Sequence, residues 1–451
     1  MLEQLSHLGS KVPPMLKRRC VVVICDSLRN DLVGAQTPTL DLLERTGTRF
    51  SQAQAVFPST TRVSSASIAT GCHPQRHGLL GNTMILSEQP GLVTRSVGKP
   101  EFRQQLFAAT GRHLKVPTLA ERLHEKFSTA IYSNVSPGAA YFFDPDSFGY
   151  VYHPAGSYGP GGSPLTGDQA LDIKQGWQGD REMTERFCDR LLADDSLALA
   201  VLWLSEPDAS GHAQCLGNQT HLDAIRHADT CVARVLEVAS ELQQRGEDVL
   251  LIVGSDHGME TVTHQIDIAQ ALVEAGLKRE LHSHEIVVAP NGTAAILGFD
   301  DDYPHTFQLM AWLDQQSWVG EWVMGQALAT WGLPDEPACR IAISLAGDDS
   351  VNEAGVAGTS WYAFDPDMPK RMIGQGQHGG RHRHERHPFL IINGGAFPSS
   401  ETVSAAVCLT DYAPTILEHL AVPSDGMQGQ PLQQLLPDNA GTTSTHSKGS
   451  L

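Results

Sequence analysis

The chain has 451 residues, of which 41% are apolar, and its formal net charge is −19. This length and apolar content suffice for a full core in one large α/β domain with insertions, or in two domains. The negative charge argues against a nucleic acid duplex as partner, because phosphate backbones need a basic surface, and against adhesion to an anionic membrane. No apolar stretch is long enough to span a bilayer.

Targeting signals and cysteine usage bear on the compartment. Residues 1–19 lack the continuous apolar segment of a signal peptide. None of the eight cysteines forms a C-x-x-C pair, and Cys20 and Cys25 fall in a predicted buried strand. Reduced thiols in a cytoplasmic protein are therefore expected, although a secreted chain that had lost its signal would look the same. The sequence does not indicate an oligomeric state.

Three apolar runs each lead into an aspartate. Runs of this kind read as strands buried on both faces of a parallel sheet, and ligands bind at the carboxyl ends of such strands. Several unpaired anions at one edge would repel one another, and cations are the usual remedy. The runs are residues 20–25 before Asp26, residues 198–204 before Asp208 and His212, and residues 249–253 before Asp256 and His257.

Strands and helices alternate along the chain, which predicts an α/β fold with a doubly wound, mostly parallel sheet. The predicted catalytic core comprises 15–260 and 375–435, and a smaller α+β cap, 261–374, is inserted between its two parts. The tail 438–451 is polar and is expected to be disordered. The predicted helices are 37–44, 61–69, 117–126, 223–245 and 411–420, the further strands are 129–132, 285–288, 293–297, 340–345 and 388–392, and 156–167 reads as an irregular loop.

The candidate ligands have distinct spacings. Asp208 and His212 are four residues apart, so both side chains lie on one side of a helical turn. Asp256 and His257 are adjacent, so their side chains would diverge and could serve two neighbouring ions. His378 lies in a glycine-flanked loop. An aspartate after a strand is most often a helix cap or turn residue, but the joint occurrence favours metal binding. Nitrogen and oxygen ligands of this mix suit Zn²⁺, with Mn²⁺ or Fe²⁺ possible.

Thr61 is the candidate nucleophile. It opens a helix of small residues directly after a Pro-Ser-Thr loop. The helix dipole and the free N–H groups there favour an anion, and a bound cation would lower the hydroxyl pKa further. On its own, the motif is better explained if Thr60 or Thr61 is only an N-cap.

Several motifs together resemble those of the alkaline phosphatase superfamily. They occur in the same order along the chain as in that superfamily, over residues 20–435. The element Glu206-Pro207-Asp208-Ala209-Ser210-Gly211-His212 resembles the P-D-x-x-G-H motif of the type I phosphodiesterase and nucleotide pyrophosphatase branch. The other matching segments are 25–27 (C-D-S), 57–61 (F-P-S-T-T), 70–78 (T-G-C-H-P-Q-R-H-G), 255–259 (S-D-H-G-M) and 409–417 (L-T-D-Y-A-P-T-I-L).

The resemblance implies a hydrolase with two zinc ions that cleaves phosphodiester or pyrophosphate bonds of a small molecule. Thr61 would attack phosphorus and give a phospho-threonine that is then hydrolysed. Asn82 matches the asparagine that hydrogen-bonds a phosphoryl oxygen. One ion would be held by Asp208, His212 and His378, and the other by Asp26, Asp256, His257 and Thr61.

Other features leave alternatives open. Arg62 follows the nucleophile where phosphodiesterases usually carry an apolar residue. It could contact substrate phosphate or a second anionic group, and it could equally pair with a nearby surface carboxylate. Two alternatives are a phosphonoacetate-hydrolase-like enzyme and a phosphomonoesterase. Both are less favoured because such enzymes place lysines near the active site in this stretch, and 127–173 contains none. A non-catalytic metal-binding scaffold is least favoured. Cys72 fits C-x-P-x-R of sulfatases but lies too late in the chain. The histidines His382, His384 and His387 read as a solvated basic loop rather than as a metal site.

Overall fold

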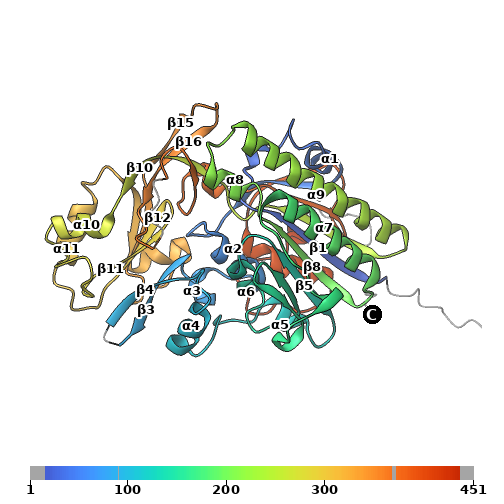
Figure 1. Cartoon of the computed structure of the whole chain (residues 1–451), viewed down its shortest axis with the longest axis horizontal. Coiled ribbons are helices and arrows are strands. Elements are labelled where there is room, and N and C mark those ends of the chain that lie inside the picture. The colour runs from blue at the N-terminus through green and yellow to red at the C-terminus, as the bar shows by residue number, and fades with distance from the viewer. Residues whose placement is uncertain (1–15, 90, 368–371, 437–451) are drawn as a thin grey trace, which may run out of the picture.

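The computed structural model describes residues 16–89, 91–367 and 372–436, so the predicted tail lies outside the described residues. A nine-stranded sheet lies at the centre of the larger part, on the right in Figure 1. Its strand order is β19-β2-β18-β9-β1-β8-β5-β6-β7. The strands are β1 (Arg18–Cys25), β2 (Thr48–Gln54), β5 (Ser128–Ser133), β6 (Tyr150–His153), β7 (Gly156–Tyr158), β8 (Leu197–Leu204), β9 (Asp248–Gly254), β18 (Leu390–Gly394) and β19 (Glu401–Cys408).

The three predicted apolar strands form the middle of this sheet. β1 pairs in parallel with β8 on one side and with β9 on the other, and Cys25 lies opposite Leu204 while Ile24 lies opposite Gly254. Every residue of β8 is buried, as is every residue of β1 after Arg18. The continuous apolar runs therefore reflect burial on both faces, and the predicted α/β fold class is confirmed.

Helices cover both faces of the sheet. Val21, Val23 and Cys25 pack with one group of helices, and Cys20, Val22 and Ile24 pack with the other, as the two-residue period of a strand requires. The first group is α1 (Pro38–Thr46), α7 (Gly176–Ala193) and α9 (Gln219–Gln244), and the second includes α2 (Thr61–Thr70), α5 (Leu119–Leu123), α6 (Pro137–Phe143) and α13 (Tyr412–His419).

The edges of the sheet depart from the expected pattern. The stretch 156–167, predicted as an irregular loop, begins with strand β7, which pairs antiparallel with β6. After β7 the chain turns sharply at Gly161 and Gly162, which both have the positive φ that glycine adopts readily. β18 is antiparallel to β9 and β2, so the sheet is mixed toward its other edge.

Three smaller sheets form the second part of the molecule, on the left in Figure 1. One has the order β15-β16-β10-β17, another β11-β12-β14-β13, and the third is the hairpin β3–β4. Their strands are β3 (Thr83–Glu88), β4 (Gly91–Ser96), β10 (Glu260–Ile266), β11 (Val287–Asn291), β12 (Ala294–Gly298), β13 (Val319–Met324), β14 (Ile341–Leu345), β15 (Gly347–Val351), β16 (Ala357–Ala363) and β17 (Gly376–Gln377).

The boundary between the two parts is shared. β10 pairs antiparallel with β17, Glu260 opposite Gln377 and Thr261 opposite Gly376, so the chain leaves and re-enters the core at neighbouring points. The hairpin β3–β4 precedes the predicted cap in sequence but shares a hydrophobic cluster with β11 and β12. The domain division itself stays a prediction. The remaining helices are α3 (Pro74–His77), α4 (Phe102–Thr110), α8 (Asp208–Ala213), α10 (Ile268–Glu274), α11 (Thr306–Leu313) and α12 (Arg383–Arg386).

Two further predictions concern the chain as a whole. No helix among the described residues combines the length and apolarity needed to cross a bilayer. All eight cysteines are unpaired. The cytoplasmic location stays a prediction.

Candidate active site

The predicted ligands meet at the carboxyl edge of the central strands. Asp26 directly follows β1, Asp208 opens α8 after β8, and Asp256 and His257 follow β9. They form two groups, in each of which one donor atom per residue lies within 4.8 Å of the others. The groups are Asp26, Asp256 and His257, and Asp208, His212 and His378.

The first group is fully buried. His257 Nε2 lies 3.0 Å from Asp256 Oδ2 and 3.7 Å from Asp26 Oδ1. The expectation that the side chains of Asp256 and His257 diverge toward two ions is therefore wrong. The backbone between them is not extended strand, since β9 ends at Gly254, so both side chains reach the same group.

The second group lies directly beside the first. His212 Nε2 is 3.3 Å from Asp208 Oδ1, as the four-residue spacing on α8 predicts, and His378 Nε2 is 3.6 Å from the same oxygen. The ring of His378 stacks on that of His257 with centroids 3.8 Å apart. The stacked rings bring the two groups into contact.

All three histidines present the same nitrogen to the site. The Nδ1 atoms of His212, His257 and His378 lie 3.0, 3.0 and 2.8 Å from the backbone carbonyls of Gly376, Gly258 and Ser59. A carbonyl can only accept, so these contacts assign the proton to Nδ1 in His257 and His378 and leave their Nε2 lone pairs free. Nδ1 of His212 lies 3.0 Å from the Gly376 carbonyl and equally 3.0 Å from the side-chain amide nitrogen of Gln377, which donates. Metal-binding histidines are oriented by contacts of this kind.

The charges of the site fit a bound cation. Asp26 Oδ1 and Asp256 Oδ2 are buried and accept no hydrogen bond. Burial, followed by the neighbouring Asp256 and Asp208, raises the pKa of Asp26 well above its usual value. Burial also raises the pKa of Asp208, but His212 and the other histidines outweigh it and lower that pKa overall. Buried carboxylate oxygens without donors and free imidazole lone pairs are the donor set of a metal site.

Ser27 and Asp180 support these ligands, and sequence reasoning missed both. Ser27 has a positive φ of 61°, and in this conformation its N–H lies 3.2 Å from Asp256 Oδ1 while its hydroxyl donates to Asp208 Oδ1 at 2.7 Å. Asp180, on α7, accepts from the N–H groups of Ser205 and Glu206, just before Asp208. Ser27 lies within the D-S motif, but no local signal marks Asp180.

Thr61 is the first residue of α2 and is 5% exposed. Its Oγ1 lies 3.3 Å from His257 Nε2, beside the first ligand group. The preceding residue, Thr60, is the N-cap but its side chain makes no capping bond, and its Oγ1 is buried without a partner. Capping therefore does not account for the two threonines.

The loop before Thr61 is joined to the loop that carries His378. The N–H of Ser59 donates to Gly379 O, the Ser59 hydroxyl donates to Gly380 O, and Gly379 N donates back to Ser59 Oγ. Together with the Ser59 carbonyl at His378 Nδ1, these bonds connect the candidate nucleophile Thr61 to the candidate ligand His378. We call this set of contacts the Ser59 junction.

Asn82 is positioned by Asn291 of strand β11. Asn291 Oδ1 accepts from the N–H of Asn82 at 2.6 Å and of Thr83 at 3.1 Å, and its amide donates to Thr83 O. Gly81 allows this approach, because a Cβ there would lie 2.5 Å from Asn291 Oδ1. The side-chain Oδ1 of Asn82 is buried without a partner.

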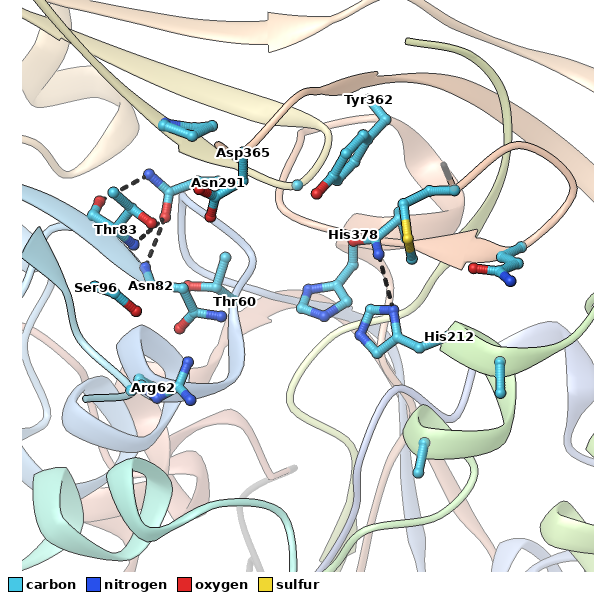
Figure 2. A pocket seen from close by; sticks show the side chains of 18 of the residues that line it. Thr60, Arg62, Asn82, Thr83, Ser96, His212, Asn291, Tyr362, Asp365 and His378 are labelled. Carbon is cyan, nitrogen blue, oxygen red and sulfur yellow. Dashed lines mark hydrogen bonds between the residues drawn. The ribbon is translucent and has the colours of Figure 1, made fainter. Parts of the chain in front are cut away.

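Asn82 lines a cavity of about 820 Å³ together with His212 and His378 (Figure 2). His212 and His378 lie at one end, and Arg62 lies under the Asn82 amide at the other (Figure 2). Lys99 also lines the cavity, which sequence reasoning missed, but its ammonium pairs with Asp367 at 3.0 Å. Burial lowers the pKa of Arg62 to about 10, so its guanidinium stays charged at neutral pH.

Two other motifs lie outside this cavity. The predicted solvated loop at His382 and His384 is instead ordered structure: His384 is buried, and its carbonyl and that of Glu385 accept from Met259 and Gly258. The loop is buried rather than solvated because its backbone accepts hydrogen bonds from the segment that directly follows His257. Cys72 is buried between α2 and α3 and does not line the cavity in the part of the chain that the structure describes.

Comparison with known proteins gives distant relatives. Human ectonucleotide pyrophosphatase/phosphodiesterase family member 1 is 24% identical over 264 residues, 56% of this chain and 24% of the relative. A Caenorhabditis elegans ectonucleotide pyrophosphatase/phosphodiesterase is 23% identical over 272 residues, 60% of this chain and 31% of the relative. The chain thus spans about a quarter to a third of these relatives.

Solved structures show the same fold. Murine ectonucleotide pyrophosphatase/phosphodiesterase 5 superposes with a TM-score of 0.65 at 16% identity, over 93% of this chain and all of that one. The human protein gives the same score and identity. Another murine structure is of an inactive variant in complex with AMP. The family model described as type I phosphodiesterase / nucleotide pyrophosphatase matches residues 20–310. This match covers more than half of the chain, which therefore belongs to the type I phosphodiesterase / nucleotide pyrophosphatase family.

Proposed function

We propose that this protein is a two-metal hydrolase that cleaves phosphodiester or pyrophosphate bonds, with Thr61 as nucleophile. The observation that carries the proposal is the position of Thr61 Oγ1, 3.3 Å from His257 Nε2 and beside two adjacent Asp/His groups. A hydroxyl at a helix N-terminus next to two cation sites has the surroundings that an activated nucleophile needs.

The ligand groups divide between two ions. Asp208, His212 and His378 would hold one, and Asp26, Asp256 and His257 the other, with Thr61 toward it. The mixed nitrogen and oxygen donors favour Zn²⁺, with Mn²⁺ or Fe²⁺ as alternatives. When bound, the ions supply Lewis-acid stabilisation of the negative charge that develops on the phosphoryl group.

The chain's own groups account for the covalent steps. Thr61 Oγ1 forms a bond to phosphorus while the bond from phosphorus to the leaving oxygen breaks, which gives a phospho-threonine. A water oxygen then replaces Thr61 on phosphorus. The Asn82 amide, fixed through its backbone by Asn291, donates to a phosphoryl oxygen.

The substrate is proposed to be a small-molecule nucleotide or other phosphodiester. The family name and the AMP complex of the murine relative support this class. Diesters are expected to be preferred over monoesters, because 127–173 contains no lysine to neutralise a second charge on the phosphoryl group. The second cavity-lining cation, Lys99, is the observation that favours the alternative of a phosphomonoesterase or a phosphonoacetate-hydrolase-like enzyme.

The test compares bis-p-nitrophenyl phosphate, p-nitrophenyl phosphate and phosphonoacetate as substrates of the zinc-loaded protein, with Thr61→Ala as control. The proposal expects the highest kcat/KM for the diester and none of these activities in Thr61→Ala. Preference for either other substrate would select that alternative. Absence of all three activities in metal-loaded protein would favour the scaffold.

A further inference from the structure

The Arg62 guanidinium is an unused charge inside the cavity. Its Nε is buried without a hydrogen-bond partner, and the side chain makes no hydrogen bond or ion pair with any residue that the structure describes, although Asp26 and Asp208 stabilise its charge from a distance. A partly buried guanidinium without hydrogen bonds is costly, whereas an anion beside it recovers that cost through paired, charge-assisted hydrogen bonds. The group is therefore suited to receive an anion from outside the protein.

The surrounding backbone fixes the guanidinium in place. A Cβ at Gly98 would lie 2.7 Å from Arg62 Nη2, and a Cβ at Gly138 would lie 2.4 Å from its Nε. The guanidinium is therefore packed between two backbone segments, and a side chain at either glycine would displace it. A charged group held in one position loses little freedom when it binds a ligand.

The position of Arg62 indicates which part of a substrate it faces. An in-line displacement places the attacking and leaving oxygens on opposite sides of phosphorus. Thr61 lies beside the group of Asp26, Asp256 and His257, so the leaving oxygen would face the other group, to which His212 and His378 belong. The substituent that stays on phosphorus then lies toward Asn82 and Arg62, at the other end (Figure 2).

The wall at this end does not suit a nucleobase. Bases are commonly recognised by stacking on aromatic side chains. Among the described residues that line the cavity, Tyr362 is the only aromatic apart from His212 and His378, and Figure 2 shows it on the far side, above His378. The Arg62 end offers a cation instead of a flat apolar surface.

We propose that Arg62, fixed between Gly98 and Gly138, forms an anion subsite, and that the preferred substrates are phosphodiesters whose retained substituent carries a second negative charge, such as a carboxylate. This inference rests on the proposed function, since it names the substrate class of the same site.

Two isosteric substrates with one leaving group test the subsite. In p-nitrophenyl carboxymethyl phosphate, the group that stays on phosphorus carries a carboxylate. In p-nitrophenyl carbamoylmethyl phosphate, that group carries a neutral amide of the same shape. The wild-type protein is expected to prefer the carboxylate by roughly 100-fold in kcat/KM, in line with two charge-assisted hydrogen bonds. Arg62→Met should bring this ratio close to one, and Arg62→Lys should keep part of it. Arg76→Met, which removes the same charge outside the cavity, should leave the ratio unchanged.

Several results would overturn the subsite. A wild-type ratio near one, or an equal loss for both esters in Arg62→Met, would show that Arg62 does not read the retained group. Loss confined to p-nitrophenyl phosphate would place Arg62 on the scissile phosphate. A higher kcat/KM for thymidine 5′-p-nitrophenyl phosphate that Arg62→Met abolishes would assign the guanidinium to a base.

A binding measurement separates this proposal from the proposed function. Calorimetry on metal-loaded Thr61→Ala with the same two esters needs no turnover. Tighter binding of the carboxylate that Arg62→Met removes supports the subsite even if the wild type hydrolyses neither ester, in which case only the diesterase proposal fails. Equal binding of both esters rejects the subsite, whether or not the wild type turns them over.

Discussion

The two ends of the cavity are built on opposite plans. At the ligand end, His212, His257 and His378 are each fixed by a backbone carbonyl, and Ser27 contacts both ligand groups. At the Arg62 end, a partly exposed guanidinium lies between Gly98 and Gly138, and it has no hydrogen-bond partner among the described residues. If the two proposals hold, the side chains that bind the metal ions are oriented from within the protein, whereas the guanidinium that selects substrates obtains its hydrogen bonds from the substrate.

Removal of metal should cause the largest loss of activity, because it takes both proposed ions from the ligand end of the cavity at once. Protein as purified is expected to contain close to two ions per chain, and a chelator should abolish hydrolysis of bis-p-nitrophenyl phosphate and lower Tm, since a ligand that binds only the folded state stabilises it. Elemental analysis and calorimetry check this. Full turnover by metal-free protein would refute metal dependence.

Loss of the nucleophile should rank second. Thr61→Ala is expected to lower kcat by about 10³-fold or more while metal content and Tm stay at wild-type values, because only the covalent route is lost. Thr61→Ser keeps the hydroxyl and should retain partial activity. Steady-state kinetics beside metal analysis decides, and kcat within tenfold of wild type in Thr61→Ala would exclude covalent catalysis by this residue.

Asn82 lies between the two ends and should have an intermediate effect. Asn82→Ala removes one donor to the phosphoryl group and is expected to lower kcat by about 10²-fold, with metal content unchanged. Asn82→Asp keeps the shape but replaces the donor with a charge, so it should be at least as damaging. If Asn82→Asp matched the wild type, the amide would not donate to the substrate.

The Ser59 junction tests whether the ligand end depends on its supports. Ser59→Ala removes the hydroxyl bonds to Gly379 and Gly380 but keeps the carbonyl at His378, so metal affinity should fall about tenfold. Competition with a chromogenic chelator measures this affinity. Ser240→Ala, on the surface of α9, is the matched control and should show wild-type affinity. Equal metal affinities in the wild type, Ser59→Ala and Ser240→Ala would show that the Ser59 junction does not support the metal site.

Cys72 should give the smallest effect, because it belongs to neither end. Cys72→Ala is expected to keep kcat/KM for the diester within about threefold of wild type, since the thiol is buried outside the cavity. A severe loss of activity with an unchanged Tm would revive the sulfatase-like reading of Cys72.

Sequence reasoning found the parts of the fold that depend on local pattern. The runs before Asp26, Asp208 and Asp256 are buried strands because their apolar character is continuous. Sequence reasoning misses β2 because T-R-F-S-Q-A-Q contains only two apolar residues, Phe50 and Ala53. It interprets β7 as a loop because Gly156 and Ser157 have low strand propensity, and the pairing with β6 makes this segment a strand.

The same distinction between local pattern and tertiary contact applies to the residues of the candidate site. The ligands could be predicted because each follows a recognisable strand or lies in a motif. Asn291 and Asp180 could not, because their partners lie far along the chain: Asn291 contacts Asn82 across 209 residues, and Asp180 contacts Ser205 across 25. Hydrogen bonds of this kind depend on tertiary packing and leave no periodicity in the sequence.

The pairing of β10 with β17 has an evolutionary consequence. Because residues 261 and 376 lie side by side, the segment between them leaves and re-enters the core at one place, and it also contacts the core through Asn291, which holds the backbone of Asn82. An insertion whose two ends meet can change in length without altering the path of the chain at His257 or His378. Asn291 sets the limit on such change, because the backbone of Asn82 depends on it.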